Sequence, residues 1–330
     1  MANVNPINVS IIIPTYNKAL YIQEAVESAL AQTYKNVEII VVDDGSTDGT
    51  TKILESYIET KKITYFYQPN KGHSAARNAG LRMAKGRYIK FLDSDDFLYP
   101  QQIEKQIQDI AEDPKAISVT DCTLLKLNGK IEIGKIFMPS PQKQYASFIE
   151  SNKVVIHAVL VPKFWLEQVG GFDETLTCSV DTDLWIRILG CGAYMKHLPF
   201  AGCCYRILRK SVSDDTENMF FQKVKIYEKI NQSFKINGIS DPFLIESLLN
   251  INTKLLEECL VRKLNPAELL VNTLEMTGKL YDFRKKGIFK MLYKMSGISN
   301  YLRVRHLIKC MTQKNYRFDL LHHNYNWKHS

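Results

Sequence analysis

The chain has 330 residues, of which 45% are hydrophobic and 24% are charged. These fractions are those of an ordinary globular protein, so they exclude a chain that is disordered by composition. The seven cysteines form no CxxC pair, which argues against both a disulfide framework and a zinc site. No apolar run is long enough to span a bilayer and no signal region opens the chain, so we expect a cytoplasmic protein.

The net charge of +8 is concentrated at the C-terminal end of the chain. Residues 261–330 hold 14 lysines and arginines against 4 acidic residues, whereas residues 1–260 have a small acidic excess. Basic and apolar faces recur within 281–330, and such helices can lie on an anionic membrane surface. A peripheral position at the inner face of the cell membrane is one reading. Packing of the apolar faces together, or a homo-oligomer interface, is the other.

The first hundred residues alternate between short apolar runs and segments with helical spacing. This alternation predicts a parallel sheet with helices between its strands. The expected strands are Val9–Ile13, Val37–Val42, Ile63–Tyr67 and Tyr88–Leu92.

From Pro114 to Asp215 the pattern is less regular and predicts a second half packed on the same sheet. Strands are expected at Ile117–Thr120, Ile131–Ile136 and Val159–Val161, and helices at Phe164–Val169 and Asp181–Leu189. Farther on, only helices are expected, at Leu248–Leu260, Tyr281–Met295 and Leu302–Met311. We therefore predict an α/β domain over 1–215, divided into halves 1–110 and 111–215, and a basic helical C-terminal domain over 216–330.

Three aspartates follow the strand Tyr88–Leu92 directly, in the run Asp93-Ser94-Asp95-Asp96. Ligands of open α/β sheets bind beyond the carboxyl ends of the strands, where these side chains would lie. Like charges at this spacing call for a cation, and Mg2+ or Mn2+ would share its coordination sphere with substrate phosphate. A turn with helix-capping aspartates before Pro100 is the alternative at this point.

Two further strand ends carry polar groups. Pro14-Thr15-Tyr16-Asn17 follows the first strand and Asp43-Asp44-Gly45-Ser46 follows the second. An aromatic ring there can stack on a nucleotide base, and a carboxylate can accept an imide N–H. Neither a GxGxxG fingerprint nor a GxxxxGK[ST] loop is present, so cations must hold the phosphate.

A calcium site competes for one of these segments. The spacing of Asp44, Ser46, Asp48 and Gly49, with Glu55 at the twelfth position, is that of an EF-hand loop. Such a loop joins two helices, whereas a β-branched strand precedes this one, which disfavours the calcium reading.

Five ordered motifs over about two-thirds of the chain together resemble glycosyltransferase family 2. They are Val9–Asn17, Val41–Asp48, Gly72–Gly80, Phe91–Asp96 and Gly170–Glu174. The resemblance implies a GT-A fold, which is Rossmann-like with a doubly wound mixed sheet. It also implies inverting transfer of a sugar from a nucleotide-diphospho-sugar, such as a UDP-sugar, to a glycan or lipid-linked acceptor in bacterial surface polysaccharide or glycan assembly.

The resemblance also implies roles for individual residues. Asp44 would read the base, Tyr16 or its neighbours would stack on it, and Arg77 would contact the nucleotide. Asp95 would be the direct ligand of Mn2+ or Mg2+, with Asp93 at the metal or the ribose. The expected donor-binding set is Pro14, Thr15, Tyr16, Asn17, Asp44, Arg77, Asp93, Ser94, Arg206, Arg209 and Lys210.

The catalytic base is expected in the helix that begins near Asp181. Asp181 shares a helical face with apolar residues and is predicted to point inward, whereas Asp183 is predicted to point outward, one turn before Arg187. A partly desolvated carboxylate has a raised pKa, which suits it to take a proton from a sugar hydroxyl. The family places a Glu-Asp pair here, and Val180 stands where the Glu is usual. The alternative is that these aspartates are acidic residues of the first helical turn, with Ser179 as the N-cap, and that they only interact favourably with the helix dipole.

The missing Glu also motivates a different class of function, a catalytically degenerate transferase fold that serves as a sugar-binding or scaffold module. A sugar-phosphate nucleotidyltransferase is disfavoured because no glycine-rich basic loop opens the chain. A processive membrane synthase is disfavoured because spans and a Gln-x-x-Arg-Trp segment are absent. Nucleic-acid binding is not expected, because no recognised module accompanies the basic charge.

Overall fold

The structure is a computed structural model that describes residues 8–110, 113–151, 154–208, 215–237 and 242–262. The chain divides into two compact units, Met1–Lys223 and Val224–Ser330, and each is described by itself. The division falls inside a helix, and the boundary expected near Asp215 stays a prediction. None of the described helices is long and apolar enough to cross a membrane.

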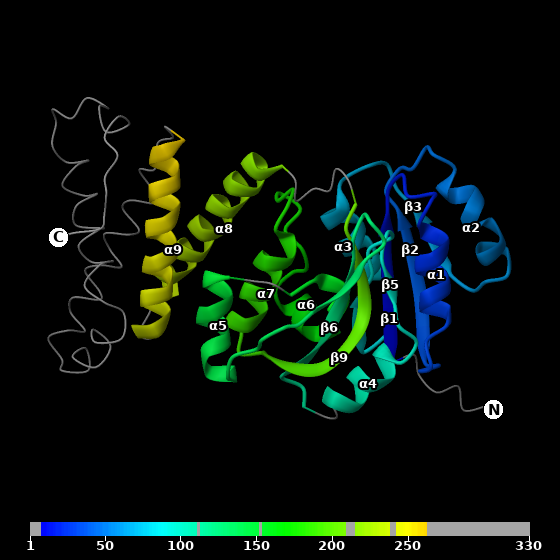
Figure 1. The fold of residues 1–330 in the computed structure, drawn as a ribbon, viewed down its shortest axis with the longest axis horizontal. Helices are drawn as coiled ribbons and strands as arrows, with labels where there is room; N and C mark the ends of the chain where they lie inside the picture. Colours follow the sequence, from blue (N-terminus) through cyan, green and yellow to red (C-terminus); the bar gives the residue numbers. More distant parts are fainter. Residues whose placement is uncertain (1–7, 111–112, 152–153, 209–214, 238–241, 263–330) are drawn as a thin grey trace, which may run out of the picture. The chain divides into compact units, whose positions relative to one another are not determined.

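A nine-stranded mixed sheet forms the centre of the first unit (Figure 1), in the order β3-β2-β1-β4-β8-β6-β9-β5, with β7 paired to β6. The first four strands in this order are parallel, and β8 then joins both β4 and β6 antiparallel. The strands are β1 Val9–Thr15, β2 Val37–Asp43, β3 Thr64–Tyr67, β4 Tyr88–Phe91, β5 Phe97–Leu98, β6 Ala116–Leu125, β7 Ile131–Gly134, β8 Val159–Pro162 and β9 Tyr194–Arg206.

Helices lie on both sides of the sheet. Figure 1 shows α1 and α3 on opposite sides of β1 and β2. Close approach is possible because Gly80 of α3 has no side chain, and a Cβ atom there would overlap Ile12 of β1. The helices of this unit are α1 Ile22–Leu30, α2 Thr50–Glu59, α3 His73–Met83, α4 Gln102–Ile110, α5 Pro141–Glu150, α6 Lys163–Gln168 and α7 Val180–Gly190, with the short helix η1 at Ile156–Ala158.

The apolar periodicities of the sequence become the core. Ile22, Ala25, Val26 and Ala29 form the buried face of α1, as their helical spacing predicts. All of the strands and helices predicted between residues 9 and 189 are present. The longest strand, β9, was not predicted, because Pro199 and Gly202 interrupt its apolar pattern.

Lys90 is the exception in this core. It lies fully buried in β4, where its Nζ donates to Oε1 of Gln106 at 2.8 Å. Gln106 in turn donates to the backbone oxygens of Ser118 and Ala158. Burial lowers the pKa of Lys90 to about 7. The ammonium group therefore links β4 to the second half of the sheet at an electrostatic cost.

In the second unit, α8 (Thr216–Asn237) reaches beyond Lys223 and α9 (Pro242–Val261) follows. The helix expected at Leu248–Leu260 lies within α9. Asn231 and Asn252 exchange two buried amide hydrogen bonds of 3.1 and 3.2 Å, which fix the register of the two helices. The helices expected at 281–295 and 302–311 lie outside the described residues.

Candidate active site

The candidate site lies at the carboxyl ends of β1, β2 and β4, the edge at which parallel α/β sheets bind ligands. In the β1–β2 register Thr15 is opposite Asp43, so the segments that follow these strands are neighbours. Asn17 links them, because its backbone N donates to Oγ of Ser46 and its Oδ1 accepts from the backbone N of Thr47. Asn17 takes a positive φ of 51°, and the Tyr16 ring beside it is 48% exposed, which leaves it open to stacking.

Asp44 is buried at the end of β2, inside a loop that its own carboxylate organises. One carboxylate oxygen accepts from Nε2 of Gln68 at 2.7 Å and the backbone N of Lys71 at 2.9 Å, and the other from the backbone N of Gly72 at 2.8 Å. Asp44 thereby holds residues 68–72 beside the ends of β1 and β2. That loop leads directly into α3.

These contacts also argue against the calcium alternative. Asp44 directs its oxygens to the loop at 68–72, whereas Asp48 accepts from the backbone N of Ala19 and from Thr50. Asp43, which sequence reasoning did not single out, accepts from Ser46 and Tyr65. Burial and Asp43 raise the pKa of Tyr65 to about 12. Because the carboxylates face different partners, they do not form a common cation cage.

Arg77 of α3 and Asp93, which follows β4, form an ion pair with 2.5 Å between Nη2 and Oδ1. Burial alone would raise the pKa of Asp93, but the charge and hydrogen bond of Arg77 outweigh it and lower that pKa. The Arg77 guanidinium lies over the Phe172 ring at 5.3 Å from its centroid. Its Nε and Nη1 atoms are buried without a hydrogen-bond partner among the described residues, so they are donors available to an anion.

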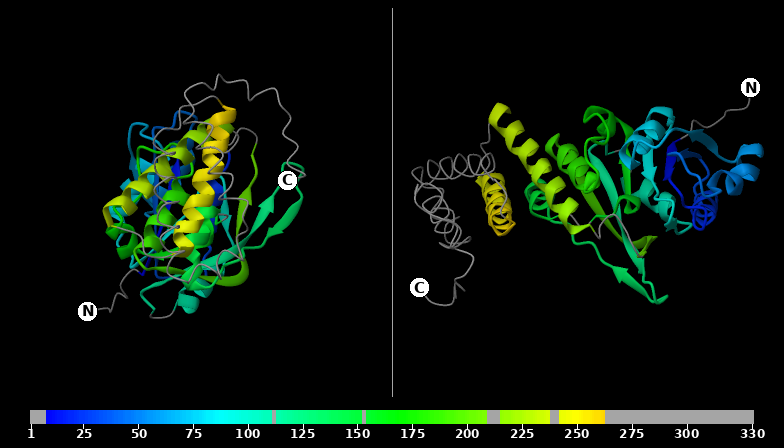
Figure 2. Two further views of the ribbon diagram at one scale, coloured as in Figure 1. Left: turned by 90° about the vertical axis from the view of Figure 1, so that its left-hand side faces the viewer. Right: turned by 90° about the horizontal axis from the view of Figure 1, so that it is seen from above.

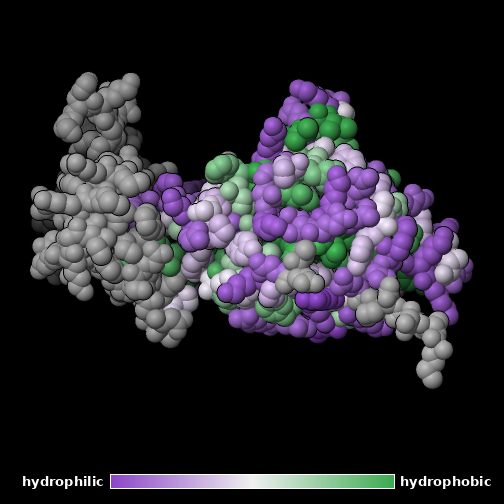
Figure 3. Space-filling view, turned by 90° about the horizontal axis from the view of Figure 1, so that it is seen from below, coloured by the Kyte–Doolittle hydropathy of each residue, from purple (hydrophilic) through white to green (hydrophobic). Residues whose placement is uncertain are grey.

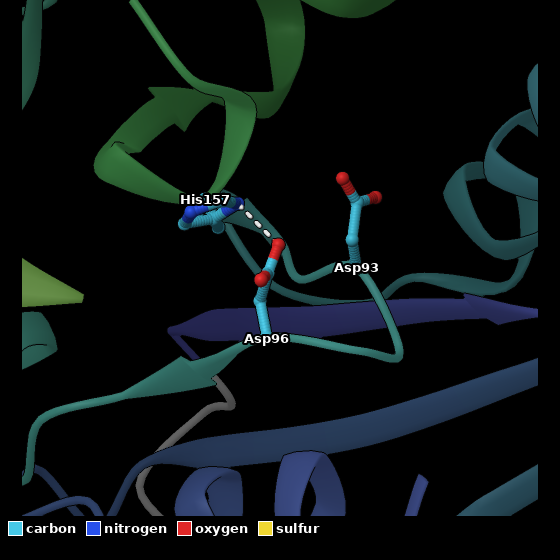
Figure 4. Close-up of side chains that lie close together, drawn as sticks. All are labelled: Asp93, Asp96 and His157. Atoms are coloured by element: carbon cyan, nitrogen blue, oxygen red, sulfur yellow. Dashed lines mark ion pairs between the residues drawn. The ribbon is translucent and has the colours of Figure 1, made fainter. Parts of the chain in front are cut away.

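Asp93, Asp96 and His157 converge at this edge (Figure 4), each offering a ligand atom within 4.8 Å of the others. Oδ2 of Asp96 lies 3.4 Å from Nδ1 of His157, and both side chains are almost fully buried. Burial, followed by the charges of Asp93 and Asp95, raises the pKa of Asp96 well above its ordinary value. Burial also lowers the pKa of His157 to about 4.

This acidic cluster fits a divalent cation. Within the described part of the chain, Oδ2 of Asp96 and both ring nitrogens of His157 are buried without a hydrogen-bond partner. Such orphaned groups are costly unless something else satisfies them. The carboxylate oxygens of Asp93 and Asp96 are of the ligand type that Mn2+ and Mg2+ prefer.

The sequence prediction of the ligands differs from this arrangement in one respect. Asp95, expected as the direct ligand, has Oδ2 2.6 Å from Nζ of Lys18. The sequence places Asp96 in the run of three aspartates expected to hold a cation, but Asp96 was not named as a ligand, and His157 was not identified. The only signal for His157 was that a polar residue interrupts the apolar run from Val154 to Val161. Ser94 is buried within the same turn.

Asp181 is half-buried near the start of α7, within electrostatic range of Arg77 and Asp93. Burial raises the pKa of Asp181. Ser179, which precedes the helix, makes no side-chain cap and takes a positive φ of 56°. The role of Asp181 as general base stays a prediction, and its raised pKa is the property that this prediction requires.

The prediction that Asp183 points outward was wrong. Asp183 is 4% exposed, and its Oδ2 accepts from Nε and Nη2 of Arg187 at 2.9 and 2.6 Å. Arg187 also donates to the backbone oxygens of Val169 and Gly171. The helical wheel was misleading because the turn at 169–171 covers this face of α7 as well. The Asp183–Arg187 pair therefore fastens that turn to the helix.

The same turn is held to α3 by Asn78. Its Nδ2 donates to the backbone oxygen of Phe172 and to Oε1 of Glu174, and its Oδ1 accepts from the backbone N of Phe172. Gly171 has a φ of +74°, and a Cβ atom there would lie 2.5 Å from Oδ1 of Asn78. The motif at 170–174 thus joins the two halves of the first unit behind the site.

Arg206 ends β9 next to the acidic cluster. Its backbone N donates to Oδ1 of Asp96 at 2.6 Å, whereas its guanidinium pairs with Glu24 and lies over the Tyr21 ring. The predicted phosphate contacts of Arg209 and Lys210 lie outside the described residues. Of the three basic residues expected near the diphosphate, Arg206 is therefore positioned at the site with its side chain already paired.

Residues 10–152 match the family model described as Glycosyl transferase family 2. An uncharacterized glycosyltransferase of Rickettsia typhi is 36% identical over 237 residues, which are 68% of this chain and 71% of that protein. The UDP-Glc:alpha-D-GlcNAc-diphosphoundecaprenol beta-1,3-glucosyltransferase of Escherichia coli is 33% identical over 62% of this chain and 79% of its own. The chain spans 58%, 27%, 31% and 31% of the length of four other rickettsial relatives.

Among solved structures, the fold is similar to that of a mannosyltransferase from Pyrobaculum calidifontis in complex with GDP-Man and Mn2+. The TM-score is 0.55 at 18% identity, over 94% of this chain and 89% of that one. The mixed sheet and its helices are therefore those of the GT-A fold. On the sequence relatives and the family match, the chain belongs to glycosyltransferase family 2.

Proposed function

We propose that the protein is an inverting, metal-dependent and non-processive glycosyltransferase that moves a sugar from a UDP-sugar to an acceptor hydroxyl. The observation that carries the proposal is the ion pair of Arg77 with Asp93, a member of the acidic cluster, at the carboxyl edge of the sheet; Asp181 lies within electrostatic range of both residues. Free cationic donors, a cation site and a desolvated carboxylate are the three components that single displacement from a nucleotide sugar requires.

On the donor side, the exposed Tyr16 ring would stack on the base while Asp44, with its loop at 68–72, lines the base pocket. The unpartnered Nε and Nη1 of Arg77 would bind the diphosphate, and Asp93 would face the ribose or the metal. Pro14, Thr15, Asn17 and Ser94 would shape this pocket, and Arg206, Arg209 and Lys210 would add positive charge.

For the metal, a bound Mn2+ or Mg2+ would stabilise the charge that develops on the departing nucleoside diphosphate. Asp95 and Asp93 are the ligands we propose. Asp96 and His157 form a second ligand set with Asp93, favoured by their unpartnered atoms. The two sets share Asp93 and are separable by substitution.

On the acceptor side, Asp181 would take the proton of the attacking hydroxyl. The hydroxyl oxygen forms a bond to the anomeric carbon as the bond from that carbon to the diphosphate breaks. An α-linked donor would therefore give a β-linked product. The Glu that usually precedes this Asp is Val180 here, but the proximity of Asp181 to Arg77 and Asp93 supports the assignment without it.

The acceptor would be a glycan or a lipid-linked glycan in bacterial polysaccharide assembly. The Escherichia coli relative supports this class, because its name specifies an acceptor on diphosphoundecaprenol. We also propose that residues 281–330, outside the described part of the chain, lie on an anionic membrane surface or form a homo-oligomer interface. No nucleic-acid partner is proposed.

The test is a screen of nucleotide sugars with Mn2+, with Mg2+ and with chelator, measuring release of the nucleoside diphosphate. We expect metal-dependent release from a UDP-sugar that Asp181→Asn abolishes. The alternative outcome is a donor that binds, as calorimetry shows, but is not turned over with any metal or with bacterial lipid extract as the source of acceptor. That result would identify a degenerate sugar-binding module.

A further inference from the structure

Strands β6 and β7 form a hairpin that projects from the first unit (Figure 2). A three-residue loop, Leu127 to Gly129, joins them. The backbone N of Lys126 donates to the oxygen of Lys130 at 2.9 Å, and Gly129 takes a φ of +78°, the left-handed conformation that such loops require. The hairpin is therefore a defined β-ribbon with a specified turn.

Large apolar side chains are exposed along this ribbon. Leu127, Ile131 and Ile133 are 57–63% exposed, and Phe137, just beyond the strand, is 91% exposed. Ile131 and Ile133 share one face of β7 because strand side chains alternate. The projecting lobe in Figure 3 accordingly carries hydrophobic residues beside hydrophilic ones. Contiguous exposed apolar groups of this kind indicate an interaction surface.

The charge of the hairpin indicates what covers this surface. Residues 126–135, at the turn end of the hairpin and just beyond β7, hold the lysines Lys126, Lys130 and Lys135 against one acidic residue, Glu132, whose oxygens are 2.6 and 3.0 Å from Nζ of the first two. A second copy of the chain would bring like charges together, and the lysines that flank the edge strand β7, Lys130 and Lys135, oppose strand-to-strand pairing. Anionic lipid headgroups complement both the lysines and the apolar side chains.

We propose that the β6–β7 hairpin docks on an anionic membrane surface, with its apolar side chains between the headgroups and its lysines at their phosphates. The hairpin is linked to the candidate site through β9, because Leu125, the last residue of β6 before the turn, is opposite Arg206 of β9, whose backbone N donates to Asp96. Docking would bring the acidic cluster close to the lipid surface. That orientation rests on the proposed function with a lipid-linked acceptor, whereas the docking itself does not.

The test is co-sedimentation of the full chain with vesicles of phosphatidylglycerol and phosphatidylcholine, and with vesicles of phosphatidylcholine alone. We expect binding to the anionic vesicles only, weakened by salt. Lys130→Gln with Lys135→Gln should lower the vesicle affinity about tenfold or more, and Ile131→Asn with Ile133→Asn by a similar factor.

Lys52→Gln with Lys62→Gln is the matched control, because it removes the same charge from two exposed lysines. These lysines lie near β3, the strand at one end of the sheet, whereas the hairpin belongs to the other half. The control should stay within about twofold of the wild type in vesicle affinity. Thermal melting of each variant verifies that it is folded, and donor turnover without vesicles reports the proposed function separately.

Three results would overturn the proposal. In the first, the wild type does not bind anionic vesicles at low salt. In the second, both folded hairpin variants bind these vesicles as the wild type does, which would mean that other residues dock. In the third, light scattering shows that the hairpin substitutions dissociate an oligomer while vesicle binding is unchanged, which would make the ribbon a contact between copies.

Discussion

The Nζ atom of Lys18 lies 2.6 Å from Oδ2 of Asp95, so the carboxylate proposed to bind the metal already forms an ion pair with an ammonium group. Both side chains are partly exposed, at 32% and 22%, so the pair can open at modest cost. Lys18 therefore competes with the cation for Asp95 if that residue is the ligand. In the Asp93, Asp96 and His157 set the paired member is Asp93, whose Oδ1 lies 2.5 Å from Nη2 of Arg77.

Substitutions at this pair should separate the two ligand sets. If Asp95 is the ligand, Lys18→Met should lower the Mn2+ concentration needed for half-maximal nucleotide binding by about two- to fivefold, because a competing charge is removed. Asp95→Asn should abolish metal-dependent binding, while His157→Gln should leave it intact. Calorimetry with Mn2+ and UDP measures this. The reverse pattern, with loss in His157→Gln only, would assign the metal to the buried set.

Asp181 and Asp183 should differ in the kind of defect that their amide variants show. Asp181→Asn should keep UDP affinity and stability but lose about 10²–10⁴-fold in turnover, the usual contribution of a general base. Asp183→Asn should lower the free energy of unfolding by about 1–3 kcal/mol, because Arg187 loses its buried partner. Urea unfolding and steady-state rates distinguish them. A stable Asp183→Asn with a turnover defect as large as that of Asp181→Asn would reverse the assignment.

The pH dependence of turnover should show the raised pKa of Asp181. A general base acts when ionised, so kcat/KM should fall as the pH decreases through a pKa above the ordinary 3.8 of an aspartate. The contribution of Asp181 to the free energy of unfolding changes with pH in the opposite direction. Because the folded-state pKa is raised, the group stabilises the protein at low pH, and this contribution is lost as the pH rises through that pKa. A rate profile flat down to the range of ordinary carboxylates would contradict the assignment.

Lys90 gives a stability prediction that is independent of catalysis. Its pKa is about 7 when folded and near 10.5 when unfolded, so the unfolded state binds more protons between these values. Stability should therefore rise with pH across this window. Lys90→Met should remove the slope and raise the free energy of unfolding at pH 7 by about 1–4 kcal/mol. Urea titrations at several pH values test it, and an unchanged slope would mean that the ammonium is better solvated than the structure indicates.

Local pattern was enough to predict the first half of the fold. The strands at 9–13, 37–42 and 88–92 are apolar runs that a single polar residue interrupts, with helical spacing between the runs, and a parallel sheet buries such strands on both faces. Strand β9 escaped prediction because its pairing with β6 is set by long-range contacts and includes a bulge near Asp121. Its own sequence, with a proline and a glycine inside, does not encode that pairing.

At the candidate site, the positions of the strand ends in the sequence were enough to predict which segments lie together. They were not enough to predict which side-chain atoms form pairs. Arg77 and Asp93 were both expected near the nucleotide, and their ion pair follows from the ends of β4 and α3 being neighbours. The pairing of Asp95 with Lys18, and of Asp96 with His157, depends on side-chain directions across segments 77 and 61 residues apart. Periodicity carries no information about such contacts.

The configuration of the sugar released by hydrolysis of the donor shows whether transfer occurs by single displacement. Water takes the place of the unknown acceptor in this reaction. Proton NMR would follow the anomeric signal of the first sugar released from an α-linked UDP-sugar with Mn2+, before mutarotation. We expect the β-anomer first with the wild type, and release about 10²–10⁴-fold slower with Asp181→Asn. Initial release of the α-anomer, or equal release by Asp181→Asn, would contradict single displacement with Asp181 as the base.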